Sequence, residues 1–295
     1  MHTRGKAVMS DRRGCPKPRV LIIGQQESFE HILTTNIQNW GYEARIVSAS
    51  TTTQENEAEG DILLFDLDKA HDTSIVTEGA QTPAKEIRAP SYPSYLVADE
   101  VRKKNRLQLP RARFTIVLSS QSVSRSTLEQ IGAVALLQKP FEMGRLQRYL
   151  RVLQRLLLEP AITQPLDEKR RILVVDDDIA IANAVQQCLI FESGYEVAVA
   201  YDGLAALEQC LDWRPDCIVT DLIMPWMNGY QVMRCLNAVS LQTMPAFVIM
   251  SALNQFEVPW NRSYMRGNVV EYVDKPFNVD RLLSAIKQAC IMHSA

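Results

Sequence analysis

The stretch Ile172-Leu173-Val174-Val175-Asp176-Asp177-Asp178 joins four consecutive aliphatic residues to three consecutive carboxylates. A short apolar run without polar interruption is typical of a parallel strand that is buried on both faces of its sheet. The residues that follow, 179–191, place apolar side chains at helical spacing. The stretch therefore predicts a buried strand that delivers acidic side chains to its carboxyl end and is followed by a helix.

The segments around this stretch occur a second time in the chain, in the same order. The matching pairs are 20–25 and 172–177, 41–43 and 194–196, 62–66 and 217–221, 114–119 and 246–251, and 139–141 and 275–277. Between these apolar runs lie helical patterns, which are clearest at 203–212 and 278–291. Strand and helix alternating five times predict a doubly wound α/β domain. The repeat therefore predicts two tandem (βα)5 flavodoxin-like domains with parallel sheets.

A proline-containing segment separates the two copies. Pro160 and Pro165 each remove a backbone donor and restrict the residue before them, which ends the preceding helical pattern. The predicted organisation is a disordered basic tail over 1–17, a first domain over 18–158, a linker over 159–168 and a second domain over 169–295.

Polar residues end the predicted strands of the second domain. The aspartates 176–178 follow the first strand, Asp221 ends the third, Ser251 ends the fourth and Lys275 ends the fifth. Ligands of open parallel sheets bind at the carboxyl ends of the strands. Clustered carboxylates are costly without a cation, and their oxygens suit Mg²⁺. A single aspartate after a strand is usually a turn or helix cap, but the whole set suits a phosphoryl group that is attacked by an aspartate.

Residues 170–292 resemble the receiver domain of bacterial two-component response regulators. The resemblance rests on the segments 175–178, 221–225, 228–229, 251–252 and 275–277. It implies that Asp221 is the phosphoacceptor. It also implies that Asp176, Asp177 and Asp221 bind Mg²⁺ together with the backbone carbonyl of Ile223.

The resemblance assigns further roles to three residues of the second domain. Lys275 and Ser251 match the lysine and the hydroxyl that assist phosphoryl transfer, and the family's proline after that lysine is usually cis. Ser251 and Tyr272 together match the switch that responds to phosphorylation. The segment 254–268 departs from the family because Pro259 and Gly267 interrupt its helix. An irregular loop and a modified docking surface both stay open for this segment.

The first domain resembles the same fold more weakly. Asp66, Ser119 and Lys139 match the acceptor, the switch hydroxyl and the lysine, but Gly24 and Gln25 stand where the metal carboxylates belong. We therefore predict a pseudo-receiver that is inert to phosphoryl donors, in which Lys139 pairs with Asp66. Domains of this kind tend to act in protein interaction.

Two further features distinguish the first domain from the second. Leu136 replaces the aromatic switch residue. A polar insertion at about 69–110 lengthens the chain between the predicted third and fourth strands, and it contains a cluster of basic residues. A solvated helix face and a site for an anionic partner both stay open for that cluster.

Composition excludes several other classes of protein. Hydrophobic residues make up 46% and charged residues 22% of the 295 residues, which is ordinary for a globular chain and excludes a disordered or fibrous one. No apolar run is long enough to span a bilayer and no secretory signal precedes the fold, so we expect a cytoplasmic protein without membrane contact. The net charge of −2 does not suggest nucleic-acid binding.

These observations predict a phosphorelay response regulator without an output domain, because few residues follow Lys275. A histidine kinase or phosphotransfer protein is the expected donor, Mg²⁺ the expected cofactor, and a downstream protein the expected partner. We do not expect an enzyme in the usual sense, and a homodimer stays open. The alternative is a protein-interaction scaffold that works without phosphorylation.

Overall fold

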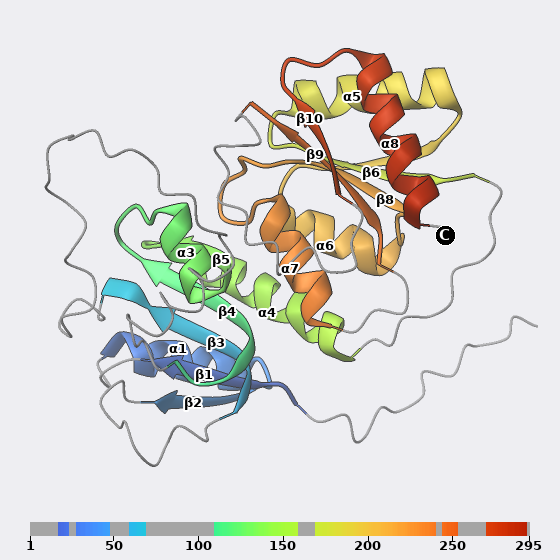
Figure 1. Cartoon of the computed structure of the whole chain (residues 1–295). Coiled ribbons are helices and arrows are strands. Elements are labelled where there is room, and N and C mark those ends of the chain that lie inside the picture. The colour runs from blue at the N-terminus through green and yellow to red at the C-terminus, as the bar shows by residue number, and fades with distance from the viewer. Residues whose placement is uncertain are drawn as a thin grey trace, which may run out of the picture.

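A computed structural model of the chain is shown in Figure 1. It describes residues 17–23, 28–47, 59–68, 109–158, 169–239, 244–252 and 270–293. The predictions for the tail (1–16), for Gly24 and Gln25, for most of the insertion (69–108), for the linker (159–168) and for 254–268 lie outside the described residues.

The first sheet contains five parallel strands in the order β2-β1-β3-β4-β5. Its strands are β1 (Arg19–Ile23), β2 (Glu43–Val47), β3 (Gly60–Asp66), β4 (Ala112–Ser119) and β5 (Ala133–Gln138). Helices α1 (Ser28–Asn39) and α4 (Met143–Leu158) pack on one face of this sheet, and α3 (Arg125–Ile131) packs on the other.

The second sheet has the same connectivity, with the order β10-β9-β8-β6-β7. Its strands are β6 (Arg171–Val175), β7 (Glu196–Ala200), β8 (Cys217–Asp221), β9 (Ala246–Ser251) and β10 (Val270–Asp274). Helices α5 (Ile179–Ser193) and α8 (Val279–His293) cover one face, while α6 (Gly203–Asp212) and α7 (Gly229–Ala238) cover the other (Figure 1).

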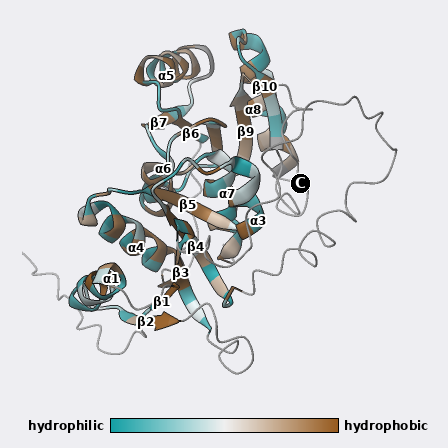
Figure 2. Ribbon diagram, turned by 90° about the vertical axis from the view of Figure 1, so that its left-hand side faces the viewer, coloured by the Kyte–Doolittle hydropathy of each residue, from teal (hydrophilic) through white to brown (hydrophobic). Residues whose placement is uncertain are grey.

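The strand order confirms the predicted fold class. In both sheets the strand order, counted from each domain's first strand, is 2-1-3-4-5, which is the flavodoxin-like order. The central strands are apolar on both faces, as the brown strands in Figure 2 show, and all four residues 172–175 are fully buried. Such burial is what a parallel sheet covered by helices on both sides requires.

One apolar core joins the two domains. It runs from the first sheet through α4 to the α6 and α7 face of the second sheet, so that α4 lies between the sheets (Figure 1). Ion pairs flank this contact. Arg148 Nε donates to Glu208 Oε1 at 3.0 Å within a two-point pair, and Arg155 Nη2 donates to Asp212 Oδ1 at 2.6 Å. Apolar burial is the main stabilising contribution here, because exposed ion pairs contribute little.

The edge of the first sheet also contacts the loop between β8 and α7. The Leu136 N–H of β5 donates to the Trp226 carbonyl at 3.0 Å, and the Arg145 guanidinium lies 3.7 Å from the centre of the Trp226 ring. Trp226 has a φ of 60°, a strained conformation for a bulky residue. The first domain therefore holds the loop that follows Asp221.

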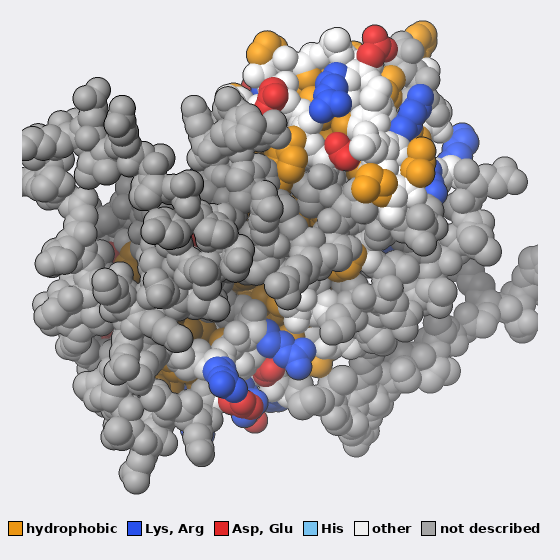
Figure 3. All heavy atoms as spheres, viewed as in Figure 1, with side chains coloured by type: hydrophobic (Ala, Val, Ile, Leu, Met, Phe, Trp, Pro, Cys, Tyr) orange, Lys and Arg blue, Asp and Glu red, His pale blue; other side chains and the backbone are white. Residues whose placement is uncertain are grey.

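The visible surface of the second domain carries charges of both signs among apolar side chains, as Figure 3 shows. Within the ranges given above, no helix combines the length and the apolar character needed to cross a membrane.

Candidate functional site

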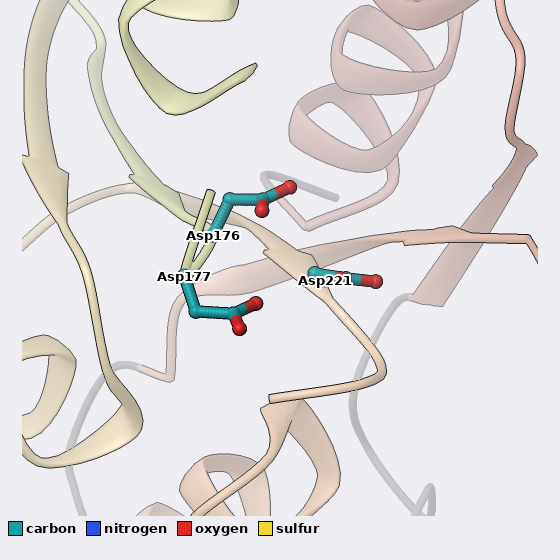
Figure 4. A group of neighbouring side chains, drawn as sticks. All are labelled: Asp176, Asp177 and Asp221. Carbon is teal, nitrogen blue, oxygen red and sulfur yellow. The ribbon is translucent and has the colours of Figure 1, made fainter. Parts of the chain in front are cut away.

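Three carboxylates meet at the carboxyl edge of the second sheet. Asp176 directly follows β6 and Asp221 ends β8, and these strands are neighbours in parallel register. One carboxylate oxygen from each of Asp176, Asp177 and Asp221 lies within 4.8 Å of the others (Figure 4). The topology thus brings Asp221 together with two adjacent residues that lie 44 and 45 positions before it in the chain. Asp176 and Asp221 are buried, whereas Asp177 is exposed.

Lys275 supplies a positive charge to this cluster. Its Nζ lies 2.8 Å from Asp176 Oδ2 and 3.3 Å from Asp221 Oδ2. The lysine follows β10, and its backbone N–H donates to the Ser251 carbonyl at 2.6 Å. The peptide bond between Lys275 and Pro276 is cis, as the family resemblance implies.

Burial and charge shift the pKa values of the two central groups. Burial raises the pKa of Asp221, with a further contribution from the negative charge of Asp176, and these effects outweigh the opposing charge of Lys275. Burial alone lowers the pKa of Lys275, but the hydrogen bond to Asp176 and the charge of Asp221 raise it overall. The ammonium therefore stays charged at neutral pH, and a second cation would favour the ionised form of Asp221.

The donor set fits a hard divalent cation. Among the residues that the structure describes, three carboxylates face one ammonium, so this cluster carries an excess of negative charge. Carboxylate oxygens are preferred ligands of Mg²⁺, which needs few protein ligands because it keeps several waters. Asp176, Asp177 and Asp221 can hold it, and the Ile223 carbonyl lies two residues beyond Asp221 in the same loop.

Local backbone hydrogen bonds orient the Asp221 carboxylate. The Leu222 N–H donates to Asp221 Oδ1 at 2.6 Å, and the Ile223 N–H also bonds this carboxylate. The other oxygen, Oδ2, faces Lys275. Asp178 has a different role, because it caps α5 by accepting from the N–H groups of Ala180 and Ile181. The acidic run thus divides into two site residues and one helix cap.

The two residues of the implied switch lie on the two strands that come after β8 in the sheet, Ser251 on β9 and Tyr272 on β10. Ser251 is buried at the end of β9, and Asp274 of β10 is its register partner. Tyr272 of β10 is half-buried against the α6 and α7 face, and its hydroxyl lies 3.5 Å from that of Tyr230. Tyr230 is the second residue of α7, so it links the Asp221 loop to Tyr272.

The degenerate site of the first domain has a different set of contacts. The predicted ion pair is present, with Lys139 Nζ 2.6 Å from Asp66 Oδ2. Ser119 is buried and donates to Asp68 rather than to Asp66. Sequence reasoning missed Asp68 and Trp226. The only sequence signal for Asp68 is a second acid two residues after Asp66, and none pointed to Trp226.

Gly229, the first residue of α7, gives a test of how tightly the loop between β8 and α7 is packed. A Cβ at this position would lie 2.6 Å from Thr220 Cγ2 and 3.0 Å from the Asp221 carbonyl oxygen. Thr220 is fully buried and its hydroxyl donates to that carbonyl, so neither group has room to shift. We expect Gly229→Ala to lower the free energy of unfolding by about 1–3 kcal/mol, measured by urea denaturation.

Gly144 is the matched control for this substitution. It lies in the first turn of α4, and a Cβ there meets no atom within 4 Å. Gly144→Ala is therefore expected to raise the free energy of unfolding by about 0.4–1 kcal/mol, since alanine has fewer unfolded conformations to lose. Equal effects of the two substitutions would contradict the packing described for the loop between β8 and α7.

Comparison with known proteins agrees with the geometry of the second domain. The family model for the response regulator receiver domain matches residues 172–287. Response regulator MprA of Mycobacterium ulcerans is 34% identical over 117 residues, which cover 40% of this chain and 48% of that protein. Its counterpart in Mycobacterium tuberculosis strain H37Rv is 33% identical over 117 residues, with 40% and 49% covered. The chain thus spans about half the length of the curated relatives it matches.

Solved structures are similar over the same share of the chain. The signal receiver domain from Bermanella marisrubri is 30% identical, covers 41% of this chain and 98% of its own, and has a TM-score of 0.37. A CheY-like receiver domain protein from Methanospirillum hungatei is 28% identical, covers 43% and 98%, and has a TM-score of 0.37. With the family match and the named relatives, residues 172–287 belong to the response regulator receiver domain family.

Proposed function

We propose that the second domain is the phosphoacceptor of a two-component phosphorelay, in which Asp221 takes a phosphoryl group in a magnesium-dependent reaction. The observation that carries this proposal is the placement of the Asp221 carboxylate, 3.3 Å from Lys275 Nζ and within 4.8 Å of the Asp176 and Asp177 carboxylates. An Asp221 oxygen forms a bond to phosphorus while the bond from phosphorus to the donor histidine breaks. The released imidazole takes up a proton, and water later hydrolyses the aspartyl phosphate.

Each group near Asp221 has a role that its geometry supports. The Leu222 N–H fixes one carboxylate oxygen, so that the nucleophile is oriented before the donor arrives. Lys275 places its ammonium beside the other oxygen, where it offsets the charge of the incoming phosphoryl group. Asp176 and Asp177 would hold Mg²⁺ with Asp221, and the cation supplies further charge neutralisation.

We infer that the phosphorylated state is read through Ser251 and Tyr272. The Ser251 hydroxyl would bind the phosphoryl oxygens, and the Tyr272 ring would respond through its contact with Tyr230. The donor is a histidine kinase or a phosphotransfer protein, and the output is a change in binding to a downstream protein. In this proposal the domain transfers the phosphoryl group to its own Asp221 and not to a separate substrate, so we do not class it as an enzyme.

The first domain, over 18–158, is in this proposal a pseudo-receiver that takes no phosphoryl group. Lys139 is paired with Asp66, and Gly24 and Gln25 offer no carboxylate for a metal. Its docking through α4 favours a role in protein interaction. That docking is also the observation in favour of the alternative, a scaffold that works without phosphorylation. The costly acidic cluster of the second domain argues against this alternative.

Labelling with acetyl phosphate tests the proposal and separates it from the alternative. We expect the wild type to gain one phosphoryl group when Mg²⁺ is present, measured by intact-mass spectrometry. Asp221→Asn should gain none, because the amide is no nucleophile. A chelator should suppress labelling of the wild type. Equal labelling of Asp221→Asn, or labelling of the wild type that ignores the chelator, would contradict the assignment, whereas a wild type that takes up no label would leave the scaffold.

A further inference from the structure

Asp68 of the first domain is surrounded by three kinds of donor. Its Oδ1 accepts from the Ser119 hydroxyl at 3.0 Å, and its carboxylate accepts from the Ser120 N–H at 2.9 and 3.0 Å. Its Oδ2 lies 3.1 Å from Lys139 Nζ. The Asp68 N–H donates back to Asp66 Oδ1 at 3.2 Å, so the loop folds over Asp66. Asp68 thus contacts a hydroxyl, a backbone N–H and an ammonium at once.

The second domain has donors of the same three kinds at the matching positions, and one of them, Lys275, lies 3.3 Å from Asp221 Oδ2. Ser119 ends β4 as Ser251 ends β9. Each serine carbonyl accepts from the backbone N–H of the lysine that follows the next strand, at 2.8 Å from Lys139 and at 2.6 Å from Lys275. Ser119, the Ser120 N–H and Lys139 are therefore the counterparts of Ser251, the N–H of residue 252 and Lys275. In both domains the residue two positions beyond the acceptor donates its N–H to the acceptor carboxylate. That residue is Asp68 in the first domain but Ile223 in the second.

We propose that Asp68 is a built-in oxyanion that occupies the place of a phosphoryl group on Asp66, so that the first domain is held permanently in the ligated state. The hydroxyl, the N–H and the ammonium that would bind phosphoryl oxygens bind the Asp68 carboxylate instead. The domain then needs neither a phosphoryl donor nor a metal to adopt this state. The proposal concerns only the first domain and does not depend on phosphoryl transfer to Asp221.

The charges around Asp68 are consistent with this arrangement. Partial burial alone raises the pKa of Asp68, but the hydrogen bond from Ser120 and the contacts with Lys139 and Ser119 lower it overall, so the carboxylate is ionised at neutral pH. Hydrogen bonds to an ionised acceptor are about twice as strong as neutral ones. Lys139 also lies 4.8 Å from the centre of the Phe29 ring. Its ammonium is thus occupied by Asp66, Asp68 and an aromatic face.

The locked site is connected to the contact between the domains. Lys139 directly follows β5, whose residue Leu136 donates its N–H to Trp226 in the acceptor loop of the second domain. A fixed conformation at Lys139 therefore fixes the strand end that holds this loop. The first domain can in this way present one constant surface to the second domain, whether or not phosphoryl donors are present.

Substitution of Asp68 in the full chain tests the proposal. Asp68→Ala removes the carboxylate and opens the site, so we expect its melting temperature to fall by about 3–6 °C. Added inorganic phosphate should then raise it by at least about 2 °C more than in the wild type, compared with chloride at matched ionic strength. Asp68→Asn, which keeps the site filled, should melt lower than the wild type without gaining the phosphate response. Asp61→Ala, at the opposite end of β3, should gain no response either.

The reverse substitution in the second domain gives a second arm. Ile223→Asp places a carboxylate next to Ser251 and Lys275, so its uptake of phosphoryl label should fall at least about tenfold relative to Ile223→Asn. This arm needs a wild type that takes up label, whereas the Asp68 arm needs none, so failure of the proposed function and failure of this inference are distinguishable. An Asp68→Ala chain that melts at the wild-type temperature, or that gains no phosphate response, would overturn the inference.

Discussion

Replacing Asp176 and Asp177 together by asparagine should lower phosphoryl uptake at Asp221 by at least about a hundredfold. The double variant removes two of the three carboxylates that can hold Mg²⁺, and even indirect changes around a metal lower its affinity by about 10–100-fold. Without the cation, the incoming phosphoryl group meets Asp221 with only Lys275 to offset the repulsion. The rate of labelling by acetyl phosphate, measured over a series of Mg²⁺ concentrations, gives the size of the loss.

Asp178→Asn is the matched control for the double variant. Asp178 belongs to the same acidic run, but its side chain caps α5, and asparagine is an equally good cap. This variant should keep uptake within about twofold of the wild type, because it removes a charge without removing a ligand. If the double variant keeps its uptake, or if Asp178→Asn loses as much, the metal site is assigned to the wrong aspartates.

The second large effect is expected at the contact between the domains. Tyr149 of α4 is only 3% exposed, within the core that joins the two sheets. Burial, together with the nearby carboxylate of Asp202 in the second domain, raises the pKa of its phenol. We expect Tyr149→Ala to lower the free energy of unfolding by about 3–5 kcal/mol, as for other buried aromatic residues. Urea denaturation followed by circular dichroism measures it.

Tyr201→Ala is the control for this aromatic truncation. Tyr201 is 40% exposed and its hydroxyl lies 3.2 Å from Asn183 Oδ1, away from the core shared by the domains. Its replacement should cost about 1 kcal/mol or less. Because the core is continuous, the wild type is also expected to unfold in one transition. The shared core would be contradicted if the wild type unfolded in two separate transitions and Tyr149→Ala shifted only one of them.

The fold and the second site follow from local features of the sequence. The apolar runs at 20–23 and 172–175 predict strands because a parallel sheet buries both faces of each strand. The site follows once the strands are ordered, since residues at strand ends such as Asp221 and Lys275 must meet at one edge. Their chemistry is present in the residue types themselves, so the order of the strands was enough to bring them together.

Apart from the pair of Lys139 with Asp66, the contacts of the first domain could not be predicted in the same way. The docking of α4 depends on which face of the helix remains uncovered after the first sheet is packed, and the repeat alone indicates two separate cores. Trp226 meets β5 only through this docking. The sequence does not single out Asp68, because its contacts depend on the donors that Ser119 and Lys139 supply from more than 50 positions away.

Peptide mapping of the acetyl-phosphate-treated wild type tests the central claim most directly. The chain is labelled with and without Mg²⁺, digested, and each aspartyl phosphate is located by mass spectrometry. We expect label on the peptide that contains Asp221, only when Mg²⁺ is present, and none on the peptide that contains Asp66. Label on Asp66, or on Asp221 at the same level without Mg²⁺, would contradict the division into one phosphoacceptor domain and one locked domain.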